Sequence, residues 1–157
     1  MNIFVLDYSP AKAAEYHCDK HVVKMILESA QLMSTAHHHF GSPLSSELYK
    51  PSHQNHPCAI WVCKTHENYN WLFELFDHLC QEYTRRYKRV HKTQGLMKFL
   101  QYPPERMPGT WATPFVQCMP EECKRRDPVE AYRAYYKAHK ASMAVWAHST
   151  QPEWWKQ

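Results

Sequence analysis

The fold is decided by one stretch between Pro10 and His39, whose middle reads Tyr16-His-Cys-Asp-Lys-His-Val-Val-Lys-Met-Ile-Leu-Glu-Ser-Ala-Gln31. Ser9 can cap a helix, and Pro10 suits the first helical position, where its missing N–H costs no hydrogen bond. No Gly or Pro follows until Gly41. The pattern therefore predicts one uninterrupted helix of about eight turns.

Two stripes run along this predicted helix. The apolar stripe predicts the face that packs on the core, and it consists of Val23, Ile26, Leu27, Ala30 and Met33. The second stripe is polar, at steps of three and four residues, and consists of His17, His21, Lys24, Glu28, Gln31 and Thr35. It places imidazoles, an ammonium and a carboxylate in one row, so it is the candidate functional face.

The whole chain has 157 residues and only three glycines, with long helical patterns and few β-rich runs. We expect a mainly α protein, a compact helical bundle forming a single domain over residues 1–157. Its start at Asn2–Leu6 favours a short extended segment. The net charge of +4 permits an anionic partner without requiring one. No membrane span or secretory signal is recognisable, which predicts a cytoplasmic protein with reduced cysteines and no membrane partner.

The second helical region extends from Ala59 to Tyr87, and Thr65 can cap a fresh start inside it, so one bent helix or two collinear helices are both open. A short helix is expected over Leu96–Leu100. The segment from Gln101 to Glu121 contains five prolines and predicts a long irregular loop. The capping signature Asp127-Pro-Val-Glu130 then predicts a last helix to about Ala147, followed by a packed tryptophan-rich tail.

Metal binding is the first chemistry to weigh. His17 and His21 are four residues apart, so two imidazoles could share a zinc ion, and a metal-dependent hydrolase is a weak alternative. The cysteine pairs are Cys58-x4-Cys63 and Cys118-x4-Cys123, whereas zinc motifs generally have two intervening residues. Buried free cysteines are therefore favoured, and no metal or cofactor is expected.

Acid–base chemistry is the second. Lys24 and Glu28 form an i,i+4 pair, which is usually a surface salt bridge. If the row is enclosed, Lys24 beside His21 could position a phosphate or act as an amine nucleophile, and Glu28 could act as a general acid or base. Both interpretations are open at this point.

Nucleic-acid binding is the third. Basic residues cluster around 85–92 and at Lys124–Arg126, Lys137 and Lys140, with tyrosines between them, and a solvated basic face is the alternative. The residues expected to bind a nucleic acid or nucleotide, by phosphate contact or by stacking, are His17, Lys20, Gln31, Arg85, Arg86, Arg89, Lys92, Trp111, Tyr132, Arg133 and Tyr136.

Three features carry a family resemblance. A short extended start leads into a helix with His21 and, seven residues later, Glu28. A long second helical region opens after His56-Pro57 and ends in basic residues, and the segment Tyr132–Lys137 is rich in Tyr and basic residues. In these features the chain resembles the small α-helical pyrimidine-dimer DNA glycosylases with AP-lyase activity of phages and bacteria, the phage endonuclease V-like family. It is also similar to uncharacterised phage proteins that share the Cys-Asp-Lys-His-Val-Val-Lys-Met motif.

The resemblance implies that Glu28 is the catalytic glutamate. The family's nucleophile is the α-amine of a small residue exposed by removal of the initiator methionine. Here residue 2 is Asn, whose size disfavours that removal. Three alternatives are open. The nucleophile is the amine of Met1, or it is the side chain of Lys20 or Lys24, or the protein has no lyase chemistry. The arginines that flank the family's glutamate are absent, and Lys24 and Gln31 share this face instead.

The leading hypothesis is a DNA base-excision enzyme that acts on a flipped or damaged nucleotide. Glu28 would stabilise the sugar or move protons, an amine would capture C1′, and His21 and Lys24 would orient the phosphate or base. Trp111, or Tyr135 with Tyr136, would fill the gap in the duplex. The alternative is a non-catalytic protein that sequesters a nucleotide. The expected partner is DNA or a nucleotide; the lesion and the oligomeric state are open.

Overall fold

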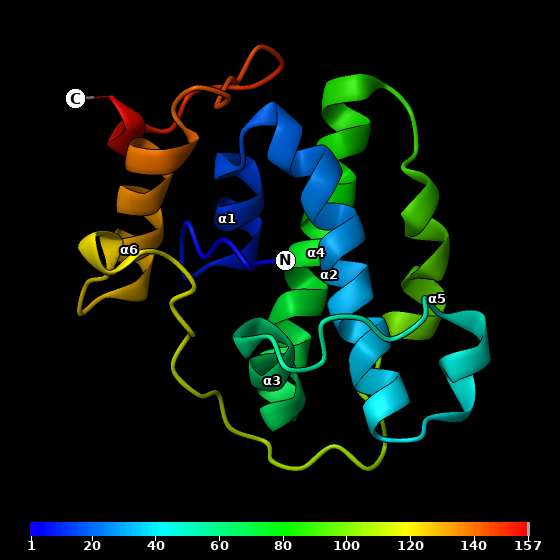
Figure 1. The fold of residues 1–157 in the computed structure, drawn as a ribbon. Helices are drawn as coiled ribbons and strands as arrows, with labels where there is room; N and C mark the ends of the chain where they lie inside the picture. Colours follow the sequence, from blue (N-terminus) through cyan, green and yellow to red (C-terminus); the bar gives the residue numbers. More distant parts are fainter. Residues whose placement is uncertain (157) are drawn as a thin grey trace.

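The computed structural model describes residues 1–156, and the regular elements among them are all helical. The α-helices are α1 (Pro10–Tyr16), α2 (Asp19–His39), α3 (Pro57–Lys64), α4 (His66–Tyr87), α5 (Met97–Leu100) and α6 (Pro128–Tyr135) (Figure 1). Short 3-10 turns occupy Pro43–Glu47, Lys92–Leu96, Glu121–Cys123 and Glu153–Trp155, and a π turn spans Tyr136–Lys140. The prediction of a mainly α fold with an extended start is confirmed.

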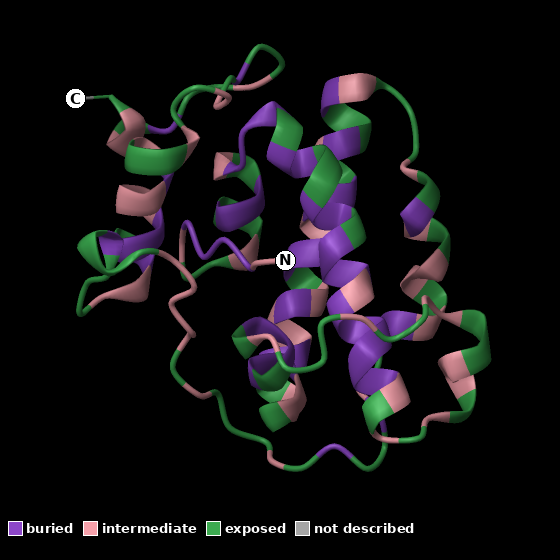
Figure 2. Cartoon of the chain, viewed as in Figure 1, coloured by how far each residue is buried: buried purple, intermediate pink, exposed green. Residues whose placement is uncertain are grey.

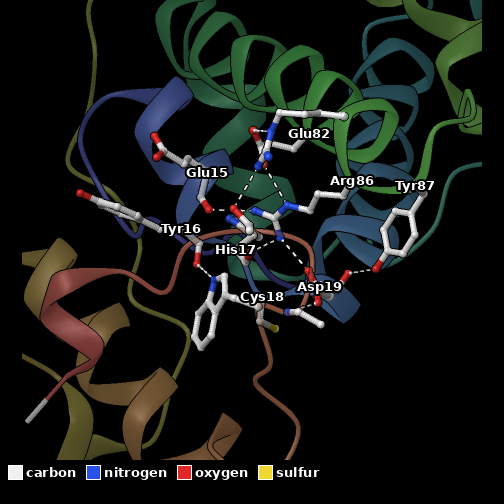
Figure 3. Close-up of polar contacts among 12 residues, drawn as sticks. Glu15, Tyr16, His17, Cys18, Asp19, Glu82, Arg86 and Tyr87 are labelled. Carbon is white, nitrogen blue, oxygen red and sulfur yellow. Dashed lines mark hydrogen bonds and ion pairs between the residues drawn. The ribbon is translucent and has the colours of Figure 1, made fainter.

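The first helix is broken, and the prediction of one helix over Pro10–His39 is wrong. α1 ends at Tyr16 and α2 begins at Asp19, with His17 and Cys18 in extended conformation between them. Arg86 of α4 reaches into this break and donates to the carbonyls of Glu15 and His17, at 2.9 and 2.8 Å (Figure 3). Tertiary hydrogen bonds thus replace the helical bonds that the break removes.

The centre of the molecule is α4, which packs against both α1 and α2 (Figure 1). Buried residues line the facing sides of α2 and α4 (Figure 2). The predicted apolar stripe of α2 is only partly correct: Ile26, Ala30 and Met33 are buried, but Val23 and Leu27 are each 38% exposed. α2 is covered by α4 and α3 and by the extended start of the chain, so its buried face is wider and rotated from the predicted stripe.

The second helical region consists of two helices rather than one bent helix. The side chain of Thr65 accepts a hydrogen bond from the main-chain N–H of Asn68 and caps α4, as one of the two alternatives predicted. The proline-rich segment is a long loop docked onto this part of the molecule. Thr113 bonds to Asn68 through both its N–H and its hydroxyl, and the indole of Trp61 donates to the carbonyl of Pro114 at 2.9 Å.

The C-terminal region is shorter in regular structure than predicted. Asp127 caps α6 as expected, but α6 ends at Tyr135 and gives way to the π turn and then to irregular chain before Ala147. The tail is packed, as expected: the ring of Trp155 lies 5.0 Å from that of Trp146. Among the described residues, none of the helices has the length and apolar character to cross a membrane.

Candidate active site at the N-terminus

The amino terminus meets Glu28 in the middle of α2. The N-terminal nitrogen of Met1 lies 3.7 Å from Oε2 of Glu28, and the main-chain N–H of Asn2 donates to the same oxygen at 3.1 Å. The Met1 side chain is only 4% exposed, although the residue as a whole is half-buried. The exposed part of Met1 is therefore its main chain, which carries the amine.

A second cation approaches the other carboxylate oxygen. Nζ of Lys24, one helical turn before Glu28, lies 3.3 Å from Oε1. The Lys24 side chain is 63% exposed, whereas that of Glu28 is 11% exposed. The carboxylate is thus mostly withdrawn from solvent and is shared by an α-amine and a lysine ammonium, two groups that can act as amine nucleophiles when unprotonated.

Asn2 fixes the position of the terminal residue. Its Oδ1 accepts from the hydroxyl of Tyr132 at 3.2 Å, and its Nδ2 donates to the carbonyl of Cys118 at 2.9 Å. Asn2 is therefore held between the proline-rich loop and α6 while its own N–H bonds to Glu28. Sequence reasoning considered Asn2 only for its size, because no spacing pattern connects residue 2 with residues 118 and 132.

His21 is enclosed rather than solvated, which is one of the two alternatives left open for the polar row. Its ring is 4% exposed, stacks on Phe4 at 4.5 Å, and places Nδ1 2.6 Å from the hydroxyl of Tyr136. Burial, reinforced by nearby His17 and by lysine charges, lowers the pKa of His21 to about 3. A neutral, enclosed His21 positions the N-terminal segment through Phe4 and does not reach a ligand.

His17 is likewise a core residue, and its predicted nucleotide contact is wrong. It is fully buried, and its Nδ1 lies 2.6 Å from the carbonyl of Ala13. Burial lowers its pKa to about 4. Nδ1 of His17 and Nδ1 of His21 both have partners within the protein, and the groups of three metal-binding side chains among the described residues lie elsewhere. Nothing here supports a hydrolase metal site at these two histidines.

The basic end of α4 divides into structural and exposed residues. Arg86, predicted to bind phosphate, is buried: its guanidinium bonds to Asp19, to Glu82 and to the carbonyls in the α1–α2 break (Figure 3). Arg85 is exposed and bonds to Glu82, and Arg89 and Lys92 are also exposed. Asp19 lies nine residues before Glu28, so this end of α4 is about 14 Å from the carboxylate along α2.

The aromatic candidates are mostly unavailable for stacking. Tyr132 and Tyr136 are both fully buried, so the prediction that they stack on a base is wrong. Trp111 is 66% exposed, so its ring is accessible. The chain beside it is held to the start of α4, because the main-chain N–H of His66 donates to the carbonyl of Gly109. The half-buried Tyr135 stacks on Phe4, at 6.1 Å between ring centroids, and is less buried than its neighbour Tyr136.

The other residues predicted to contact a nucleic acid differ in how accessible they are. Arg133 is committed to the N-terminal segment, because its guanidinium donates to the carbonyl of Leu6 and to the carboxylate of Asp7. Lys20 is exposed and Gln31 is half-buried. The ammonium of Lys140 lies 4.9 Å from the ring centroid of Tyr135 and 6.0 Å from that of Phe4. Lys140 is therefore better placed than Arg133 to contact a DNA phosphate, because the guanidinium of Arg133 is already bonded to Leu6 and Asp7.

The thiol of Cys58 lies 3.6 Å from Oδ1 of Asn2. Cys58 and Cys118, with His56, form a group whose potential ligand atoms all lie within 4.8 Å of one another. The structure therefore places Cys58 beside Cys118, whereas the pairs considered from the sequence were Cys58 with Cys63 and Cys118 with Cys123.

Comparison with known proteins identifies a family. The family model described as pyrimidine dimer DNA glycosylase matches residues 1–94, which include Met1, Glu28 and the helices α1 to α4. The matched region excludes α6, so it lends no support to the resemblance noted for Tyr132–Lys137. No curated protein and no solved structure gives a match. The family model spans more than half of the chain, and the chain therefore belongs to the pyrimidine dimer DNA glycosylases, a family of DNA-repair enzymes.

Proposed function

We propose that this protein removes a damaged pyrimidine from DNA and cleaves the resulting abasic site, with the N-terminal amine as nucleophile and Glu28 as its partner. One observation carries the proposal: the Met1 nitrogen lies 3.7 Å from the enclosed Glu28 carboxylate, within the region that the family model matches. A nucleophile and a carboxylate within reach of one another are the basic requirement for amine catalysis of this kind.

The chemistry begins when the amine, having lost its extra proton to water, attacks C1′ of the damaged nucleotide beside the ionised Glu28. The new C1′–N bond forms as the glycosidic bond breaks, and the departing pyrimidine takes the electron pair and a proton from water. Loss of the second amine proton and opening of the sugar ring to a 4′-hydroxyl give an imine. Removal of a C2′ proton then expels the 3′-phosphate, and water finally hydrolyses the imine and frees the amine.

Glu28 serves two purposes in this sequence. Its carboxylate accepts the proton that the nitrogen loses when the imine forms, and in the earlier step, while still ionised, its negative charge stabilises the positive charge that develops on the sugar as the glycosidic bond breaks. The 11% exposure of the side chain strengthens the second effect, since charges interact more strongly away from bulk water. Lys24 is the competing nucleophile, because its ammonium contacts the other oxygen of the same carboxylate.

The proposed DNA surface has two parts. Lys24 contacts Glu28, and Lys140, after α6, lies 6.0 Å from the ring centroid of Phe4 in the N-terminal segment, so both are suited to phosphates beside the target nucleotide. Arg85, Arg89 and Lys92 are exposed at and just after the C-terminal end of α4 and form the proposed second group. At this end of α4, Arg86 pairs with Asp19, which lies about 14 Å before Glu28 along α2. A separation of that size corresponds to about four nucleotides along one strand.

The experiment is an incision assay on ultraviolet-irradiated duplex DNA, with undamaged duplex alongside. Glu28→Gln should lose turnover by at least a hundredfold while binding irradiated DNA within a few-fold of the unsubstituted protein. Glu74→Gln is the matched control, since Glu74 is an exposed acid on α4, and it should leave both properties unchanged. Equal loss of binding and turnover in Glu28→Gln, or no incision by the unsubstituted protein, would contradict the proposal.

A further inference from the structure

His56, Cys58 and Cys118 come together from two parts of the chain. His56 caps α3, Cys58 lies in the first turn of α3, and Cys118 belongs to the proline-rich loop. The two Sγ atoms are 3.6 Å apart, and Cys58 is fully buried while the other two residues are half-buried. Nothing in the base-excision chemistry uses these three side chains.

We propose that these three residues bind a zinc ion. Thiolates and imidazole are the donors that zinc prefers. With zinc–sulfur bonds of about 2.3 Å, two thiolates of a tetrahedral site lie about 3.8 Å apart, which is close to the observed 3.6 Å. A disulfide would need about 2.0 Å between the sulfurs. The three ligand atoms lie within 4.8 Å of one another, so one ion can reach all of them.

The three ligand side chains already lie close together. Nδ1 of His56 accepts the main-chain N–H of Cys58 at 3.1 Å, so the imidazole is held against the first turn of α3, and a metal ion at Nδ1 would replace this capping bond. The thiol of Cys58 donates a hydrogen bond to Sγ of Cys118, so the two sulfur atoms already face each other. Zinc binds each cysteine as its thiolate, so binding of the ion would release both thiol protons.

Asn2 offers the fourth donor. Its Oδ1 lies 3.6 Å from Sγ of Cys58, so the amide oxygen, or a water bound to it, can complete a tetrahedral set. A metal ion here would tie the start of α3, the proline-rich loop and the N-terminal segment together. Because the main-chain N–H of Asn2 donates to Glu28, the ion would also hold the candidate active site in place.

A second group of potential ligands provides a contrast. Glu122, Cys123 and His139 also lie close together, but this group has a single thiol, and the exposed Glu122 and His139 are already bonded to each other at 3.1 Å. It lacks the pair of thiolates that distinguishes the first group. Cys123 is buried and is therefore a suitable control for the loss of a buried cysteine.

The test uses the full chain, purified under reducing conditions, freed of metal and titrated with Co²⁺ as a probe for zinc. We expect one Co²⁺ per chain, an intense thiolate-to-cobalt charge-transfer band, displacement of that band by Zn²⁺, and a higher melting temperature with Zn²⁺. Cys118→Ser and His56→Gln should weaken binding at least tenfold, and Cys118→Ser should also reduce the band. Cys123→Ser should behave like the unsubstituted chain.

The half-buried Cys118 and His56 are chosen so that the variants retain their fold, which circular dichroism verifies. Sub-stoichiometric cobalt, absence of the charge-transfer band, or an unchanged titration in both Cys118→Ser and His56→Gln would overturn the proposal. So would a fully reduced chain that binds no metal but forms a Cys58–Cys118 disulfide on exposure to air. These readouts are metal content, absorbance and melting, so they do not depend on DNA chemistry.

Discussion

Arg86 and Asp19, 67 residues apart in the sequence, form an ion pair with 3.2 Å between Nη1 and Oδ1, and the arginine side chain is fully buried. The same guanidinium also bonds to Glu82 and to two main-chain carbonyls of the α1–α2 break. A residue that the sequence suggests for phosphate binding is thus the group that closes a helix break in the core. Substitution of Arg86 should therefore lower the stability of the fold, whereas substitution of its exposed neighbour Arg85 should have little effect on stability.

Arg86→Ala should lower the free energy of unfolding by about 3–5 kcal/mol, since it leaves the buried carboxylates and carbonyls without their donor. Arg85→Ala should lower it by less than about 1 kcal/mol, because Arg85 is exposed. Urea unfolding of the two variants measures both effects. A stable Arg86→Ala variant with weakened DNA binding would show instead that Arg86 faces the DNA.

Arg89→Ala and Lys92→Ala should weaken DNA binding without affecting stability. Each removes one exposed cation of the second proposed phosphate group, so each should reduce the slope of log K against log salt by about one. The measurement is equilibrium binding to a duplex at several salt concentrations. Lys12→Ala is the control: its exposed ammonium pairs with Glu15 on α1, and an equal loss of slope in that variant would mean that the effect is only one of net charge.

Stability should decrease as the pH falls below about 6.5. Burial lowers the pKa values of His17 and His37 to about 4 and that of His21 to about 3 in the folded protein, whereas an unfolded histidine has a pKa of about 6.5. Between these values the unfolded chain binds more protons than the folded chain. Each histidine therefore stabilises the fold fully above about pH 6.5 and loses up to about 1.4 kcal/mol per pH unit below it.

Urea unfolding at pH 8, 6 and 5 measures this dependence. His37→Gln should flatten the slope by removing one of the three groups, while His39→Gln should leave it unchanged, because His39 is exposed. A free energy of unfolding that stays constant from pH 8 to pH 5 would contradict the burial of these imidazoles.

Tyr136→Phe should cost about 1 kcal/mol of stability, because it removes the hydroxyl that lies 2.6 Å from Nδ1 of His21. Incision per folded molecule should not change, since both residues lie in the core. Urea unfolding and the incision assay together check this. A variant of unaltered stability that no longer binds irradiated DNA would restore the stacking role expected from the sequence.

Sequence reasoning was accurate where the determinants are local. Ser9, Thr65 and Asp127 each cap the helix that follows them, because capping depends on a residue and its next two or three neighbours. The mainly α class followed from helical periodicity, and the family model supports the family resemblance that was noted from the sequence.

The errors arose where distant residues decide the local structure. The break after Tyr16 depends on Arg86, which supplies hydrogen bonds from another helix. The polar row on α2 was predicted as one face, yet the extended start of the chain and the residues after α6 cover its first two histidines. The grouping of Cys58 with Cys118 spans 60 residues, and cysteine spacing carries no information about it.

The central claim is that the N-terminal amine beside Glu28 is the nucleophile, and borohydride trapping on irradiated duplex DNA tests it most directly. Intact mass first establishes the terminal residue of the purified chain; the nitrogen atoms of Met1 and Asn2 lie 3.7 and 3.1 Å from the same carboxylate oxygen. The account predicts a covalent adduct that maps to the α-amine of that residue. An adduct on Lys24 or Lys20, or no adduct at all, would contradict it.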